Sequence, residues 1–99
     1  MVGYTTTIHR SAKRELEQLP DSGSERLTTA IADVAQERQP SGHEKCEALE
    51  GQPGLFRVRV GDYRAILELS KPELQVLSVG HRSSVYECVD SLDERRVTA

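Results

Sequence analysis

The sequence predicts one α+β domain over residues 1–99, in which a small antiparallel or mixed β-sheet is covered on one face by an N-terminal helical hairpin. Three observations predict this fold. Apolar residues recur at helical spacing through residues 12–35, and residues 55–79 alternate with the period of two that strands require. A capping-box pattern at residues 84–87 is typical of a helix start. The expected element order is therefore β-α-α-β-β-β-α.

The N-terminal part is expected to hold one strand and two helices. Residues 4–8 are rich in β-branched side chains and predict a short strand. A helix is expected from Ser11 until Pro20 stops it, and a second is expected from the capping box at residues 22–25 until just before Pro40. The predicted apolar faces of the two helices consist of Ala12, Leu16 and Leu19, and of Leu27, Ile31, Val34 and Ala35.

The C-terminal part is expected to hold the sheet. Residues 40–54 are polar and contain several glycines and prolines, so we predict a loop with at most one turn of helix or a short strand. The three predicted strands cover residues 55–60, 63–69 and 74–79. A C-terminal helix is expected from Ser84 onward.

The composition suits a folded protein of the cytoplasm. The chain is 36% hydrophobic and 29% charged, which argues against disorder, and no apolar run approaches the roughly 20 residues of a membrane span. Cys46 and Cys88 lie far apart and are expected to be free thiols, without the spacing of a zinc site. The three histidines are scattered as well. We therefore expect neither a metal nor another cofactor.

Charge is distributed unevenly along the chain. The formal net charge is −3, which taken alone argues against a nucleic-acid partner. Residues 54–82, however, carry five Lys/Arg against three Asp/Glu, which makes this segment locally +2 within an acidic protein. Because polyanion binding depends on where basic charge is focused, the segment remains a candidate binding surface.

The hairpin register predicts which side chains share a face of the sheet. If Gly61 and Asp62 form a two-residue turn, Arg59 lies directly opposite Arg64. The face toward the helices is then expected to carry Phe56, Val58, Val60, Tyr63, Ala65 and Leu67, with Leu77 and Val79 from the last strand. The opposite face is expected to carry Arg57, Arg59, Arg64 and, just beyond the last strand, Arg82. We call these four residues the arginine face.

Like charges in directly opposed positions cost stability, and Glu68 is the one acidic residue that strand alternation places on the arginine face. Guanidinium groups stay charged at physiological pH and bind phosphate oxygens bidentately. The cluster therefore favours a phosphodiester ligand. Each arginine taken singly is explained as well by a solvated side chain on the surface of a sheet.

At this point the residues resemble a known family. Residues 55–67 (LFRVRVGDYRAIL) and 79–86 (VGHRSSVY) resemble the signature of RelE-type toxins in the RelE/ParE superfamily, and residues 9–20 resemble its first helix. The resemblance implies a small sheet with two N-terminal helices. It also implies metal-independent cleavage of mRNA in the ribosomal A site by attack of the ribose 2′-hydroxyl on the adjacent phosphate. A cognate antitoxin would wrap the toxin and block it, in a toxin–antitoxin hetero-oligomer.

The resemblance also assigns roles to single residues. Arg64 matches the arginine that binds the scissile phosphate, and Arg82 matches the one that stabilises charge in the transition state. Tyr86 matches a tyrosine that stacks on or orients a base. Alternatively, Tyr86 has only a structural role and packs in the first turn of the predicted C-terminal helix.

Arg57 and Arg59 match substrate-binding positions at which well-studied relatives have lysines. An arginine is a poor general acid or base, so proton transfer would fall to His81, unless His81 is only a structural residue at the strand end. Glu47 or Glu50 is an alternative base. Two other functions remain open, a ParE-like inhibitor of DNA gyrase that cuts nothing and a degenerate toxin that only holds RNA.

Overall fold

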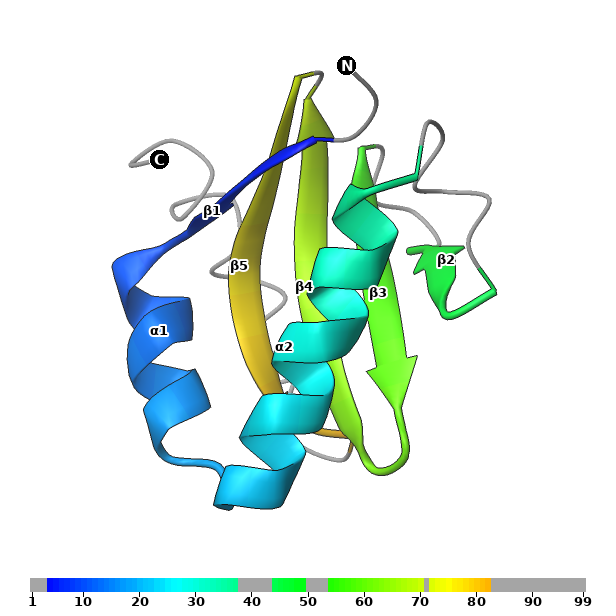
Figure 1. Cartoon of the computed structure of the whole chain (residues 1–99). Helices are drawn as coiled ribbons and strands as arrows, with labels where there is room; N and C mark the ends of the chain where they lie inside the picture. The colour runs from blue at the N-terminus through cyan, green and yellow to red at the C-terminus, as the bar shows by residue number, and fades with distance from the viewer. Residues whose placement is uncertain (1–3, 38–43, 50–53, 71, 83–99) are drawn as a thin grey trace.

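Two helices pack against one face of a five-stranded mixed sheet (Figure 1). The computed structural model describes residues 4–37, 44–49, 54–70 and 72–82. The elements within this part of the chain are β1 (Thr5–Ile8), α1 (Arg10–Glu17), α2 (Asp21–Ala35), β2 (Cys46–Ala48), β3 (Leu55–Val60), β4 (Tyr63–Ser70) and β5 (Glu73–His81). The α+β class and the helical hairpin are confirmed. The predicted C-terminal helix lies outside the described residues.

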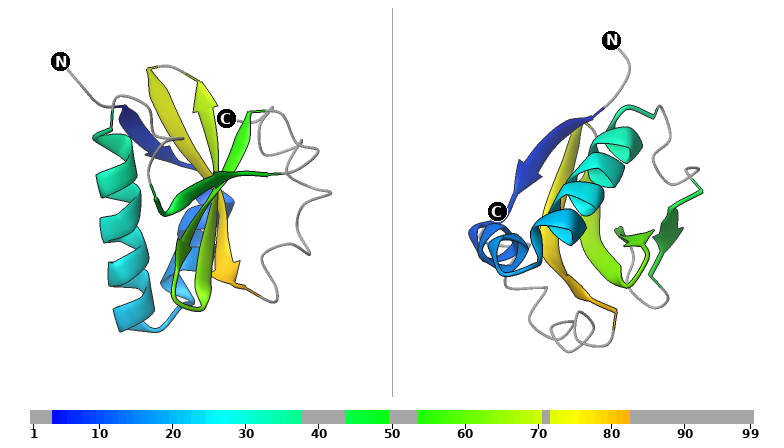
Figure 2. Two further views of the ribbon diagram at one scale, coloured as in Figure 1. Left: turned by 90° about the vertical axis from the view of Figure 1, so that its right-hand side faces the viewer. Right: turned by 60° about the horizontal axis from the view of Figure 1, so that its bottom comes forward.

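The strand order across the sheet is β1-β5-β4-β3-β2. Strands β2 to β5 pair antiparallel with their neighbours, whereas β1 pairs parallel with β5. The parallel pair needs a long crossover, and the two helices lie within that crossover. Figure 2 shows the helices together on one side of the sheet. None of the described helices is both long and apolar enough to cross a membrane.

The helix starts differ slightly from the prediction. Helix α1 begins at Arg10, one residue early, because His9 caps it: the Nδ1 atom of His9 accepts a hydrogen bond from the Ser11 N–H at 3.1 Å. The predicted N-cap at Ser22 is wrong, since α2 already begins at Asp21. The N-cap is Pro20, whose φ of −55° is set by its ring and whose carbonyl accepts the Ser24 N–H at 2.9 Å.

The main core lies between the helices and the sheet. It contains five of the predicted helix residues and most strand side chains of predicted parity, whereas Leu16, Leu19, Phe56 and Tyr63 are partly buried at its margin. Leu77 departs from the prediction. A β-bulge shifts the register so that Ile66 pairs with Ser78 and Leu67 with Val76, which leaves Leu77 as the extra residue. Leu77 therefore packs on the opposite face of the sheet, with Leu55 and Ile66.

Helix α1 also holds the C-terminal end of β5 in place. Strand β1 ends level with Val76, and within the described part of the chain no strand pairs with the next part of β5 on that edge. Glu15 of α1 takes over there: its Oε1 atom accepts the Ser78 hydroxyl at 3.1 Å and the Val79 N–H at 3.3 Å. A side chain thus satisfies a backbone donor that β1 leaves unpaired. The end of β5 that carries His81 is positioned by this contact.

Candidate functional site

The turn between β3 and β4 sets the register of the arginine face. Gly61 has a positive φ of +57°, whereas no described residue other than glycine has one, and a positive φ at the first turn residue is the pattern of type II′ hairpins. Arg59 pairs with Arg64 and Val60 with Tyr63. The predicted register is therefore confirmed, and the two arginines lie directly opposite each other on adjacent strands.

The end of β5 meets this turn. Tyr63 pairs with His81, and Arg64 pairs with Gly80. The backbone N–H of Arg82 donates to the Asp62 carbonyl at 2.7 Å, and Arg82 Nε lies 3.8 Å from Asp62 Oδ1. Asp62 therefore contacts Arg82 in addition to forming the turn. The structure thus brings Arg82 and His81 to the same end of the sheet as the opposed arginines.

The edge strand β2 adds a carboxylate to this face. Strand β2 pairs with β3 so that Glu47 lies opposite Arg57. Glu47 Oε2 accepts from Arg57 Nη2 at 2.7 Å and from Arg57 Nε at 3.1 Å, and Oε1 lies 3.4 Å from Arg59 Nη2. Glu47 is thus a second carboxylate on this face beside the predicted Glu68, and the strand that carries it falls in the segment for which only a loop with at most a short strand was predicted.

These contacts change the chemistry of Glu47. The hydrogen bond from Arg57 lowers the pKa of Glu47, and the positive charges of Arg59, Arg57 and Arg64 lower that pKa further. A carboxylate stabilised in this way is a weak base. Glu47 is thus better suited to hold arginines than to take a proton from a hydroxyl. Glu50, the other candidate base, lies outside the described residues.

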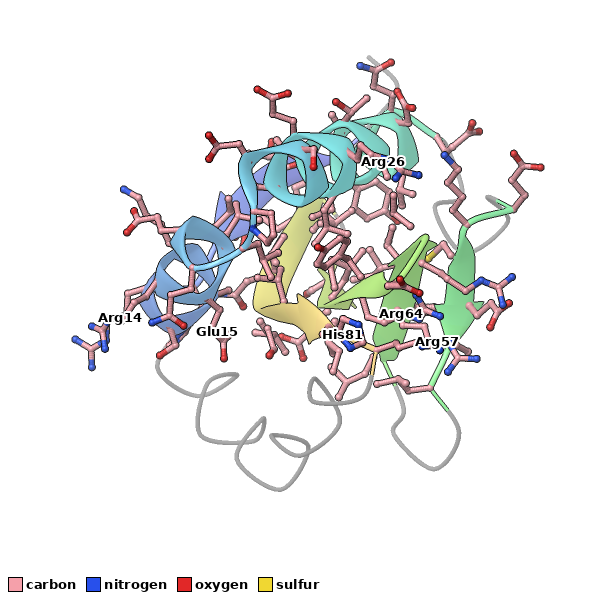
Figure 3. The ribbon with its side chains drawn as sticks, turned by 90° about the horizontal axis from the view of Figure 1, so that it is seen from below. Arg14, Glu15, Arg26, Arg57, Arg64 and His81 are labelled. Atoms are coloured by element: carbon pink, nitrogen blue, oxygen red, sulfur yellow. The ribbon has the colours of Figure 1, made fainter. Side chains whose placement is uncertain are left out.

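Arg64 is held by uncharged acceptors. Its Nη1 atom donates to the Gly61 carbonyl at 2.7 Å and to the Tyr63 carbonyl at 2.8 Å, so the guanidinium folds over the turn. Neither acceptor carries a formal charge. Arg57, Arg59, Arg64 and Glu47 together carry a formal charge of about +2 at neutral pH. Figure 3 shows Arg57, Arg64 and His81 at the sheet, with Arg14 and Arg26 on the helix layer.

His81 is exposed and lies beside an aromatic ring. The ring centroids of His81 and Tyr63 are 6.2 Å apart and the planes are nearly perpendicular at 86°, an edge-to-face contact. Tyr63 in turn packs against helix α2, where Gly23 leaves room for its ring. The prediction that Tyr63 belongs to the core side is confirmed. The contact between Tyr63 and His81 was not predicted from the sequence, because it depends on the pairing of β4 with β5.

Sequence comparison places this arrangement in a family. Residues 7–86 match the sequence model of a family described as the ParE toxin of the type II toxin–antitoxin system parDE. This chain belongs to the ParE toxin family. It is therefore a type II toxin of the RelE/ParE superfamily, the superfamily that the sequence motifs indicated. No protein of a curated set matches the toxin at a significant level.

Solved structures of RelE toxins share the fold. The toxin is similar to the archaeal RelE–RelB complex of Pyrococcus horikoshii, with 28% identity, a TM-score of 0.65, and coverage of 82% of this chain and 97% of that one. The RelBE2 toxin–antitoxin complex of Mycobacterium tuberculosis is 27% identical, with a TM-score of 0.68 and coverage of 84% and 95%. A mutant of the E. coli toxin RelE in its free state is 19% identical, with a TM-score of 0.78 and coverage of 95% and 98%, which shows the fold alone.

The remaining predictions concern a metal site, the two cysteines and Tyr86, and the structure describes only some of these residues. Among the described residues, no group of three or more His, Cys, Asp or Glu side chains is placed to hold a metal ion. Cys46 is a buried free thiol, and burial, followed by the charge of Glu47, raises its pKa to about 11. This thiol stays protonated at physiological pH and is a poor nucleophile. Tyr86 and Cys88 lie outside the described residues.

Proposed function

We propose that the toxin is a ribosome-dependent mRNA endoribonuclease. The observation that carries the proposal is the opposed pair of Arg59 and Arg64, which lies on the sheet face away from the helices, with the carboxylate of Glu47 at 3.4 Å from Arg59. Such a pair costs stability, so it is better explained by a ligand with negative charge than by the fold. The solved complexes of similar toxins, at 27% and 28% identity, contain RelE-type members and support the same branch.

The proposed reaction is a transesterification. The 2′-oxygen of a ribose attacks the adjacent phosphorus while the bond from phosphorus to the 5′-oxygen breaks, which leaves a 2′,3′-cyclic phosphate and a 5′-hydroxyl. Arg64 binds the scissile phosphate, and Arg82 stabilises the charge that develops on it. Arg59 binds the substrate backbone, and Arg57, whose guanidinium holds Glu47, contributes its positive charge to the site. Tyr86 is assigned the role of stacking on a base because the sequence around it resembles that of RelE toxins.

Proton transfer in this proposal falls to His81. The 2′-hydroxyl must lose a proton and the leaving 5′-oxygen must gain one. His81 is exposed, lies at the same end of the sheet as Arg64 and Arg82, and makes an edge-to-face contact with Tyr63. An imidazole is the side chain whose ordinary pKa suits both steps near neutral pH. Arginine side chains are too basic to act as the general acid or base near neutral pH.

The test is primer extension on a message translated by purified ribosomes. We expect the toxin to cut the message inside the ribosome, and Arg64→Ala to lower cleavage by about a hundredfold. Because Arg64 also binds the turn carbonyls, thermal melting of each variant is measured beside its activity. Arg14→Ala, on the exposed surface of α1, is the matched control and is expected to cleave normally. Equal cleavage by Arg64→Ala and Arg14→Ala would reject the site.

A second candidate function is inhibition of DNA gyrase, which the match to the ParE family model favours. A supercoiling assay with the same preparations separates the two. Inhibited supercoiling without cleavage of a translated message would support the gyrase inhibitor. Cleavage without any effect on supercoiling would support the endoribonuclease.

We further propose a cognate antitoxin as the protein partner. Several similar toxins were solved in complexes with their antitoxins. The helix layer of this toxin has an apolar groove that suits such a partner, lined in part by Ile8, Leu16, Ile31 and Val76. Ile8 is 44% exposed, which is unusual for a large apolar side chain on the described surface. We expect a short antitoxin gene to lie beside the toxin gene. Coexpression of its product is expected to restore growth, and a failure to do so would count against this partner.

A further inference from the structure

Glu47 binds two members of the arginine face unequally. With Arg57 it makes two hydrogen bonds, from Nη2 at 2.7 Å and from Nε at 3.1 Å, both to Oε2. Its other oxygen, Oε1, lies 3.4 Å from Arg59 Nη2. The side chain of Arg59 is also more exposed, at 52% against 34% for Arg57. The carboxylate is therefore anchored to Arg57 and only loosely attached to Arg59.

The unequal contacts of Glu47 determine which of the two arginines an incoming anion can bind. Charge-assisted hydrogen bonds in proteins are about 2.7–2.9 Å long, so the contact to Arg57 has that length and the contact to Arg59 exceeds it. An exposed ion pair without close hydrogen bonds contributes little stability, and a competing anion displaces it easily. A phosphate oxygen can thus take the place of Oε1 at Arg59 while the Arg57 contact persists.

We propose that Glu47 is an internal counterion that competes with phosphate for Arg59, with Arg57 as the residue that positions it. The inference rests on the proposed function only in that the ligand of the arginine face is a phosphodiester. It deepens that function by assigning the control of RNA affinity to one carboxylate. Glu47 weakens the binding of bare RNA, so that cleavage depends on further contacts in the ribosome.

The first test measures RNA binding by the full chain. Fluorescein-labelled oligouridine is titrated with the wild-type toxin, with Glu47→Gln, and with Glu17→Gln as a control. Glutamine keeps an oxygen that accepts from Arg57, and Glu17 is an exposed residue of α1, so both variants lose one negative charge. We expect Glu47→Gln to bind roughly fivefold more tightly, as removal of one nearby unit charge in a solvated site predicts. Glu17→Gln should bind as the wild type does.

The salt dependence adds a second readout. For single-stranded nucleic acid, the slope of log affinity against log salt changes by about 0.7 for each phosphate charge neutralised. Exposing Arg59 fully in Glu47→Gln should therefore make the slope steeper by about that amount. Unchanged or weaker binding by Glu47→Gln, relative to Glu17→Gln, would overturn the proposal.

The wild-type protein supplies a test that needs no variant. The Nε–H signals of Arg57 and Arg59 are followed by NMR as oligouridine is added. The Arg59 signal is expected to move while that of Arg57 stays in place. Equal movement of both signals, or no movement of Arg59, would contradict the exchange of ligands at Arg59.

The outcomes separate this inference from the proposed function. Tighter binding by Glu47→Gln, without cleavage of translated mRNA by the wild type, would keep the counterion and reject the endoribonuclease. Cleavage of translated mRNA with no gain of RNA affinity in Glu47→Gln would reject the counterion alone. An absence of RNA binding by both proteins would reject the counterion and the phosphate site together.

Discussion

Gly23 of helix α2 lies against the ring of Tyr63 on β4. A Cβ atom at Gly23 would be 2.6 Å from Tyr63 Cε2 and 2.7 Å from Cζ, closer than carbon atoms approach in proteins. Gly23 is buried, and its missing side chain lets the tyrosine ring fit between the helix layer and His81. A glycine in a helix interior is normally unfavourable, so the close approach supplies the physical reason for it.

We therefore expect Gly23→Ala to destabilise the toxin. Alanine favours a helix over glycine by about 1 kcal/mol, but the clash with the Tyr63 ring should cost more, about 1–3 kcal/mol. The free energy of unfolding in urea measures the difference. Ser22→Ala, at an exposed position of the same helix, is the control and should leave stability within about 0.5 kcal/mol of the wild type. Stabilisation by Gly23→Ala would show that the ring does not lie where the structure places it.

The second prediction concerns the pKa of Glu47. Arg57 is the largest cause of its low value, so Arg57→Ala should raise the pKa of Glu47 toward the ordinary glutamate value of about 4.3. Carboxyl carbon chemical shifts followed through an acid titration report this pKa directly. Arg14→Ala, which removes an equal charge from α1, should leave the pKa unchanged.

The sign of the linked stability follows from the direction of the shift. Because the pKa of Glu47 is lower in the folded protein, its ionised form favours folding above the ordinary glutamate pKa. That contribution is lost as the pH falls through the folded pKa. Arg57→Ala should therefore weaken the acid dependence of unfolding below about pH 4.3. An unchanged acid dependence would contradict the ion pair.

The third prediction concerns Leu77, which the β-bulge turns away from the helices. Leu77 is fully buried, so Leu77→Ala should cost about 2–5 kcal/mol of unfolding free energy. A double-mutant cycle distinguishes the two faces of the sheet. Leu77→Ala should couple with Ile66→Ala, because the two side chains share a cluster, and should add independently with Leu27→Ala in the helix-side core. The reverse pattern would show that Leu77 has the parity that simple alternation predicts.

Local patterns in the sequence determined the hairpin and much of the candidate site. A two-residue turn at Gly61 and Asp62, together with strict alternation on both sides, places Arg59 opposite Arg64 without any knowledge of the rest of the fold. The helical hairpin followed from apolar spacing in the same way. The predicted start of α2 was wrong because Pro20 caps the helix two residues before Ser22, the first residue of the capping box.

Only the tertiary structure decided which carboxylate accompanies the arginines. Strand β2 has three residues, too few for a recognisable period, and it forms because the edge of β3 supplies partners for its backbone. Glu47 reaches Arg57 through that pairing, across a separation of ten residues in the chain. The bulge at Leu77 likewise depends on how β5 fits against β4. Alternation and turn chemistry act over a few neighbouring residues, whereas strand pairing across the sheet depends on contacts between distant segments that form only when the chain closes on itself.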